Sequence, residues 1–91
     1  MKYVVCFDIS DDKKRKIIGD ILSEFGVRVQ RSVFEIEINK NFLKKILAEI
    51  EKYISKDDSI RFYPMHNDTI KKSIYLGFGS FPFDGEDVYY F

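Results

Sequence analysis

An aspartate at the end of an apolar run is the first residue in this chain whose position suggests chemistry. The run Lys2 to Ile9 reads KYVVCFDI, and Asp8 is its only carboxylate. Removing a carboxylate from water costs several kcal/mol unless it is paired, hydrogen-bonded or bound to a metal ion. A basic stretch, Lys13 to Lys16, follows closely. This combination predicts either a metal-bearing site that attracts phosphates or an ordinary Asx-type turn before a solvated helix start.

The spacing of apolar residues predicts the elements that position Asp8. Lys2 to Ile9 is strand-like, with apolar residues at both odd and even positions. Alternate residues of a strand point to opposite faces of a sheet, so we expect both faces of this strand to be packed against other parts of the protein. Ser10 is expected to cap a helix whose apolar residues recur at helical spacing as far as Phe25. Gly26 is expected to end that helix.

The rest of the chain continues this alternation of elements. Val27 to Ile38 alternates without a Gly or Pro turn signal and, taken alone, reads as one long strand. A second helix is predicted from about Asn41 to Ile54. Ser59 to Met65 is strand-like, and Pro64 indicates a sheet edge or a strand terminus. Ser73 to Gly77 predicts a short last strand.

This order predicts an α+β fold, a ferredoxin-like sandwich with two helices on one face of an antiparallel sheet. We expect one domain over residues 1–77 and an aromatic, acidic tail over 78–91. Val4, Cys6 and Val33 lie at the parity that faces away from the helices, so a second copy is expected to pack sheet against sheet. Asp8 shares that face. Two facing carboxylates then need a shared proton or cation, and Mg²⁺ suits an oxygen-only site.

The composition indicates which partners and which cellular compartment such a dimer would have. Fifteen basic and fifteen acidic residues cancel, so attraction to a polyanion has to come from a local patch. The single Cys6 has no partner for an internal disulfide. No apolar stretch reaches the length of a membrane span, and no signal-peptide pattern opens the chain. We therefore expect a cytoplasmic protein that has no membrane contact.

Four short motifs resemble one known family. The stretches YVVCFDIS, DDKKRKI, FGVRVQRSVFEIEI and DSIRFYPM occur in the order and spacing of the small CRISPR-associated nuclease of the adaptation module, the Cas-two family. The resemblance covers roughly residues 1–77. It implies a βαββαβ homodimer, with a tight reversal near Arg31 and Ser32 that divides the long strand. It also implies that the extra short C-terminal strand joins the sheet of the partner subunit.

The resemblance also implies a metal site. The family's metal-binding aspartate ends the first strand, and Asp8 is the matching residue, so Asp8 is expected to be catalytic and to bind Mg²⁺ or Mn²⁺ shared across the dimer two-fold axis. Other family positions tied to activity or nucleic-acid contact match Arg15, Arg28 and Phe34. Phe7 stands where many members have Tyr before the aspartate.

Several of these residues also have a purely structural interpretation. Lys14 and Arg31 are expected, with Arg15 and Arg28, to contact phosphates, but the basic stretch also reads as a solvated helical turn. Arg28 and Arg31 equally read as ordinary strand-surface charges. Phe34 shares its parity with the apolar residues that follow it, which favours the core. Phe7, Ser10 and Phe34 are expected to be accessory residues of the site.

Two activities follow from the resemblance, and they belong to different classes. The first is metal-dependent cleavage of phosphodiester bonds in RNA or duplex DNA. The second is a scaffold role, in which the dimer bridges the CRISPR integrase, the Cas-one protein, and holds new spacer DNA through phosphate contacts. A toxin-type endoribonuclease and a non-catalytic dimeric binding module, such as a small-molecule sensor, remain as alternatives, because a ferredoxin-like fold does not fix a function.

Overall fold

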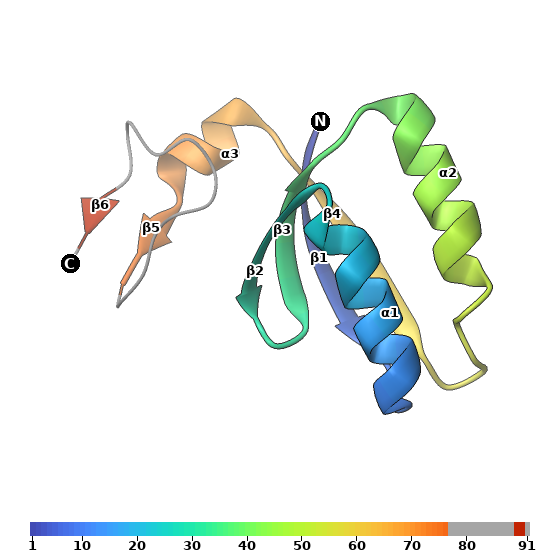
Figure 1. Ribbon diagram of the computed structural model, residues 1–91. Coiled ribbons are helices and arrows are strands. Elements are labelled where there is room, and N and C mark those ends of the chain that lie inside the picture. Colours follow the sequence, from blue (N-terminus) through green and yellow to red (C-terminus); the bar gives the residue numbers. More distant parts are fainter. Residues whose placement is uncertain (77–88, 91) are drawn as a thin grey trace.

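A four-stranded antiparallel sheet is the centre of the molecule, and its strands run in the order β2-β3-β1-β4 (Figure 1). The computed structural model describes residues 1–76 and 89–90. The elements are β1 (Lys2–Asp8), α1 (Asp12–Ser23), β2 (Gly26–Gln30), β3 (Val33–Glu37), α2 (Lys40–Glu51), β4 (Ser59–Met65), α3 (Asn67–Lys72), β5 (Ile74–Tyr75) and β6 (Tyr89–Tyr90). The ferredoxin-like α+β fold predicted from the sequence is confirmed.

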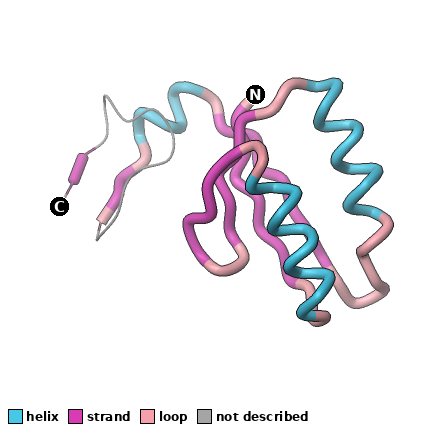
Figure 2. The backbone as a smooth tube through the Cα atoms, in the orientation of Figure 1, coloured by secondary structure: helices cyan, strands magenta, loops and turns pink. Residues whose placement is uncertain are grey.

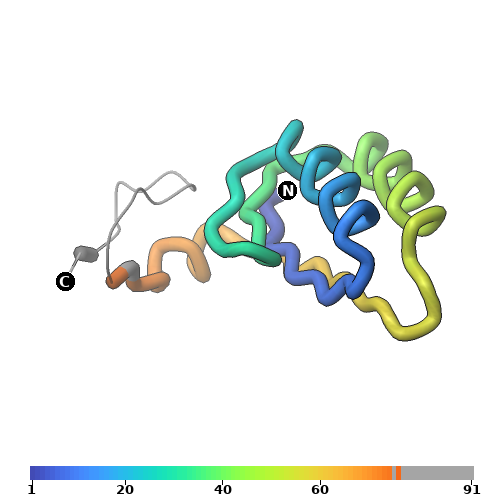
Figure 3. Tube along the Cα trace, turned by 60° about the horizontal axis from the view of Figure 1, so that its bottom comes forward, coloured from blue at the N-terminus to red at the C-terminus, as the bar shows by residue number. Residues whose placement is uncertain are grey.

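The two long helices cover the same face of the sheet, as Figure 3 shows from below. The core lies between them and the sheet, where Phe34, Ile36 and Val5 from the strands are inaccessible to solvent. Ile18 and Leu22 of α1 are equally buried against them. In the described part of the chain no helix covers the opposite face, which carries Asp8.

The start of α1 differs from the sequence-based expectation. Asp11, not Ser10, is the N-cap: its carboxylate accepts a hydrogen bond from the Lys14 N–H at 2.9 Å. An acceptor at this position satisfies one of the backbone donors that the first helical turn leaves free. The prediction for Ser10 was wrong by one residue, because three consecutive residues here are all good capping types and Ser10 is engaged elsewhere.

The second helix is shorter than predicted. It is capped by Asn39, whose side chain accepts from the Phe42 N–H at 2.9 Å, and it ends at Glu51 rather than at Ile54. Tyr53 and Ile54 nevertheless pack against the core. The predicted apolar stripe is therefore confirmed at Ile46 and Ile50, whereas Phe42 and Leu47, which were also assigned to it, are exposed.

The segment that periodicity reads as one strand is a hairpin. Arg31 and Ser32 form the turn between β2 and β3, as the family resemblance implies. A register shift between Arg28 and Gln30 places Val29 as an extra residue in β2. A bulge of this kind increases the local twist and makes an edge strand less able to pair with another chain.

Gly26 opens β2 and does not end α1, which is complete at Ser23. A Cβ atom at Gly26 would collide with the Glu35 carbonyl oxygen and lie 2.6 Å from the Cα of Ile36. Both contacts are with backbone that belongs to the β3 ladder, so neither can move cheaply. Glycine is required here because β2 and β3 approach each other closely.

We therefore expect Gly26→Ala to lower the free energy of unfolding by about 3 kcal/mol, the cost of forcing atoms into a packed region. Gly19→Ala is the matched control, because the close contact of its Cβ would be with the end of the flexible Arg28 side chain, 2.6 Å from Nη2, and its distance of 3.8 Å from the Phe34 ring is an ordinary van der Waals contact. In a helix, alanine is also favoured over glycine. Chemical denaturation of both variants measures the difference, and equal stabilities would contradict the proposed close approach.

The C-terminal elements lie beyond the sheet (Figure 2). The short strand predicted over Ser73 to Gly77 is present as β5 and pairs in parallel with β6 of the same chain. Its addition to a partner's sheet stays a prediction. The helix α3 was not among the elements predicted from the sequence. Most of the tail assigned to 78–91 lies outside the described residues.

Candidate functional site

The uncovered face of the sheet is a mixed apolar and charged surface. Residues directly opposite one another in paired strands point to the same face, so the ladder registers identify its members. These are Lys2, Val4, Cys6 and Asp8 of β1, Val33, Glu35 and Glu37 of β3, and Ser59, Arg61, Tyr63 and Met65 of β4. We call this set the open sheet face. Tyr63 on this face is 48% exposed.

Asp8 lies at the end of β1, at one edge of the open sheet face. Its neighbour across the ladder is Ser59, and its side chain is exposed. It borders a shallow pocket of about 360 Å³, whose lining residues are Cys6, Phe7, Asp8, Ser59, Arg61 and Tyr63. Because it is exposed, the carboxylate is available to a ligand.

Arg61 is the member of this pocket that the sequence analysis missed. It pairs with Cys6, which places it diagonally across the ladder from Asp8 on the same face. Its Nη1 lies 3.5 Å from the Tyr63 hydroxyl, to which it donates, and it forms no ion pair with Asp8. The pocket thus presents a carboxylate and a guanidinium side by side, one suited to a cation and the other to a phosphate oxygen.

The described residues of one chain do not form a complete metal centre by themselves. In the part of the chain that the structure describes, no group of three or more His, Cys, Asp or Glu side chains could hold a metal ion. The other side chains that line its pocket are the Cys6 thiol, the Ser59 and Tyr63 hydroxyls, the Arg61 guanidinium and the Phe7 ring, and none of them is a second carboxylate or a histidine. The donor set therefore fits one ligand of a site shared between two copies, as the sequence predicts, and not a whole site.

The basic first turn of α1 follows Asp8, and its side chains are held in place. Lys14 Nζ donates to Ser55 Oγ at 2.9 Å. Arg15 Nη1 donates to the Ile9 carbonyl at 2.8 Å, and its other terminal nitrogen forms an ion pair with Asp12. Lys14 and Arg15, two of the four residues predicted to contact phosphates, thus lie at the same end of the molecule as Asp8 and are hydrogen-bonded to the loops around it.

Ser10 contributes to this end of the molecule through a long-range contact instead of a helix cap. Its N–H donates to Asp58 Oδ1 at 3.3 Å, and its hydroxyl lies 3.5 Å from the same oxygen. The connection joins the β1–α1 loop to the loop that precedes β4. Sequence reasoning had no signal for a pair 48 residues apart.

Of the remaining predicted site residues, Phe34 and Arg28 lie away from Asp8, whereas Arg31 lies near it. Phe34 is fully buried, with the Phe7 ring stacked at 6.0 Å between centroids on the helix side of the sheet. Arg28 lies over the Phe34 ring, its guanidinium carbon 5.1 Å from the centroid. Phe34 is therefore a packing residue and not a platform for a base. Arg31 is exposed in the hairpin turn, whose Ser32 carbonyl accepts from the Phe7 N–H, so it lies near the Asp8 end.

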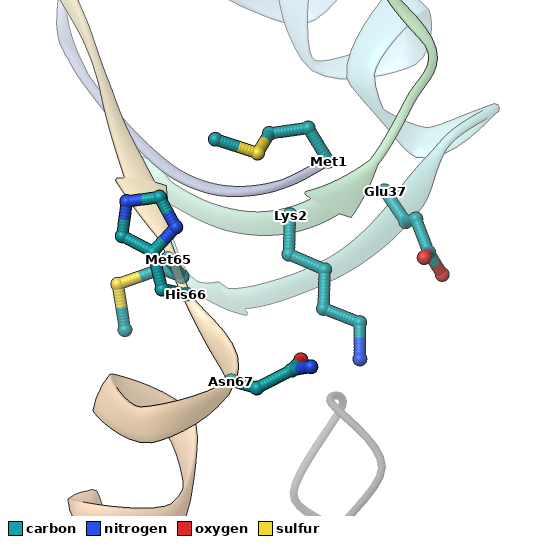
Figure 4. A pocket seen from close by; sticks show the side chains of 6 residues that line it. All are labelled: Met1, Lys2, Glu37, Met65, His66 and Asn67. Carbon is teal, nitrogen blue, oxygen red and sulfur yellow. The ribbon is translucent and has the colours of Figure 1, made fainter.

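A second hollow lies at the opposite end of β1. Figure 4 shows Met1, Lys2, Glu37, Met65, His66 and Asn67 arranged around it. Its one histidine and one carboxylate accompany a lysine ammonium group, which disfavours a cation. His66 is at the N-cap position of α3 without a side-chain capping bond. The pocket that contains Asp8 is therefore the stronger candidate for chemistry.

Among residues 1–76 and 89–90, no helix is long and apolar enough to span a lipid bilayer.

Comparison with known proteins identifies the family to which the chain belongs. The family model described as CRISPR associated protein Cas2 matches residues 1–76. The CRISPR-associated endoribonuclease Cas2 3 of Synechocystis sp. is 42% identical over 69 residues, which is 75% of each chain. Other curated relatives are longer, and the chain matches 52% and 56% of the length of two of them.

Two solved structures show the same architecture. Streptococcus pyogenes Cas2 at pH 6.5 superposes with a TM-score of 0.75 and 26% identity, covering 85% of this chain and all of that one. A chain in a partial Cas6-RT-Cas1–Cas2 complex gives a TM-score of 0.71 and 35% identity, covering 79% of this chain and 80% of that one. The family model spans most of the chain, including β1, the basic turn and β4. This chain belongs to the CRISPR-associated protein Cas2 family.

Proposed function

We propose that this protein acts in CRISPR adaptation as a homodimer that binds a Cas1-type integrase and the DNA to be inserted, and that it also cleaves phosphodiester bonds with a divalent metal. The observation that carries the proposal is the exposed Asp8 beside Arg61 on a sheet face that no helix of the described residues covers. The Cas1-containing complex in which a similar chain was solved supports the integrase as partner.

The homodimer follows from the open sheet face. Val4 and Cys6 are only half-buried at its centre, and Tyr63 and Val33 flank them. A second copy packed on this face would remove that apolar surface from water, at a gain of about 25 cal/mol per Å². It would also bring two copies of Asp8 together if the two-fold axis passes near the end of β1, which gives the metal its second carboxylate.

Cleavage would use both charges of the pocket. Mg²⁺ or Mn²⁺ held by two Asp8 carboxylates would polarise the phosphoryl oxygen and lower the pKa of a bound water. Arg61 would hold a non-bridging phosphate oxygen, and its Nη1 lies 3.5 Å from the Tyr63 hydroxyl on the same face. Because curated relatives carry the name endoribonuclease, RNA is the first substrate to assay, with duplex DNA second.

Duplex DNA binding would depend on the basic first turn. We expect Lys14→Ala combined with Arg15→Ala to weaken the binding of a duplex and to reduce its salt slope by about one unit for each phosphate that the protein no longer neutralises. In reconstituted spacer integration with a Cas1-type integrase, the same variant should need more protein to reach the wild-type yield.

Lys40→Ala combined with Lys44→Ala is the matched control, since it removes two exposed cations from α2. Affinity is measured by fluorescence anisotropy across a salt series, after thermal melting has shown that both variants fold. If both double variants had the wild-type slope, the first turn would not be the DNA interface. If the integrase inserted spacers equally well without this protein, the scaffold role would be refuted.

A further inference from the structure

Asp58 is the centre of the contacts around the candidate site. Its Oδ1 accepts from the Ser10 N–H at 3.3 Å, and its Oδ2 accepts from the Ser55 N–H at 2.9 Å. Its own N–H donates to the Ser55 carbonyl at 3.0 Å, which closes a tight turn over residues 55–58. One carboxylate thus joins two loops that are distant in the sequence.

Both of these loops lead directly to residues of the candidate site. Ser10 follows Asp8 by two positions and precedes the cap of α1. Ser55 accepts from the ammonium group of Lys14 at 2.9 Å, so the position of that cation depends on the same turn. The residue after Asp58 is Ser59, the ladder neighbour of Asp8. Asp58 therefore connects the β1–α1 loop to the loop before β4, the two segments beside the pocket, without lining the pocket itself.

The charge state of Asp58 favours these contacts at neutral pH. Hydrogen bonding from the Ser55 N–H, and then from the Ser10 N–H and the nearby Lys14 charge, lowers the pKa of its carboxyl group. A carboxyl group whose folded pKa is lowered contributes stability that is present above the unfolded pKa. That contribution is lost only as the pH falls through the folded pKa. The ionised acceptor is in place at any pH used for nucleic-acid work.

We propose that Asp58 is a positioning residue, which holds the β1–α1 loop and the Lys14 ammonium group in the arrangement that meets a nucleic-acid phosphate. This inference rests on the proposed role of the basic first turn in DNA binding. It assigns Asp58 no direct contact with the nucleic acid, because its oxygens are occupied by backbone donors and its charge would repel a phosphate.

Comparison with Asp57, the preceding residue, distinguishes a positioning role of Asp58 from an effect of its charge. Asp57 is exposed, carries the same charge and makes no hydrogen bond or ion pair within the described residues. Asp57→Ala should therefore leave duplex affinity unchanged or slightly tighter, since it removes only a repulsive charge. Asp58→Ala removes an equal charge and also the hydrogen bonds between the two loops. We expect it to bind a short labelled duplex about two- to tenfold more weakly than Asp57→Ala, which is the range expected for hydrogen bonds of ordinary strength.

Asp58→Asn provides a conservative variant, since it removes the charge but keeps an oxygen that can accept from the Ser10 N–H. Its affinity should fall between those of the two alanine variants, and it keeps the test valid if Asp58→Ala does not fold. Equal affinities for Asp58→Asn, Asp58→Ala and Asp57→Ala would overturn the positioning role while leaving the first turn as the interface. An unchanged affinity in the Lys14 and Arg15 double variant would refute both proposals.

Discussion

Asp8→Asn is expected to abolish Mg²⁺-dependent cleavage of RNA or duplex DNA and to leave the fold and the scaffold role intact. The substitution keeps the shape of the side chain and removes one negative charge from each chain. Loss of a direct metal ligand should cost more than the ten- to hundredfold that outer-shell partners of a metal typically contribute, so we expect a loss of at least about a hundredfold. Asp8 is exposed, and no hydrogen bond to its carboxylate is seen in the described structure, so folding should not suffer.

The assay compares wild type and Asp8→Asn, purified identically, for cleavage with Mg²⁺ or Mn²⁺ and for spacer integration with a Cas1-type integrase. Asp11→Asn is unsuitable as a control because Asp11 caps α1, whereas Asp57→Asn removes a charge from an exposed turn. Integration should persist in Asp8→Asn if the protein serves there only as a scaffold. Equal cleavage by both preparations would mean that Asp8 is a turn residue or that the activity came from a contaminant.

Val4→Asp is expected to convert the proposed homodimer to a monomer. Val4 lies at the centre of the open sheet face, between Glu35 and Tyr63 in the neighbouring strands. Packing a second copy on this face would bury two unpaired carboxylates per dimer, each at a cost of several kcal/mol. The dissociation constant should therefore rise by about a thousandfold or more.

Ile17→Asp is the matched control, since it makes the same change on the exposed side of α1, away from the open sheet face. Analytical ultracentrifugation at micromolar concentration measures the oligomeric state, and thermal melting verifies that each variant folds. Tyr63→Asp, on the same face but more exposed, is a second variant if Val4→Asp does not fold. A wild type that sediments as a monomer, or a Val4→Asp variant that stays dimeric, would contradict the sheet-to-sheet arrangement.

The strands that hold the candidate site were predictable from the sequence because their apolar patterns are strong. Ser59–Met65 is observed with the predicted bounds, and β1 ends one residue before the predicted Ile9. The hairpin of β2 and β3 was not predictable from periodicity, since Arg31 and Ser32 carry no glycine or proline that would mark a turn. Family resemblance supplied that division.

The parts of the site that sequence reasoning missed depend on contacts between distant segments. Arg61 becomes a neighbour of Asp8 only because β4 pairs beside β1, a choice that no local pattern encodes. Ser10 and Asp11 are both good capping residues, and the contact of Ser10 with Asp58 is a tertiary one. Propensity alone could not decide between them. Asp8 could be identified as a candidate site residue without any knowledge of its partners, because a single carboxylate in an apolar strand is unusual.

The most direct test of the proposed shared metal site is the number of metal ions bound per chain, because among the described residues Asp8 is the single carboxylate that lines the pocket. Calorimetric titration of the metal-free wild-type dimer with Mn²⁺ should give one ion for every two chains. The same titration of Asp8→Asn should show no binding at this site. One ion per chain in the wild type, or unchanged binding in Asp8→Asn, would contradict a metal site shared through Asp8.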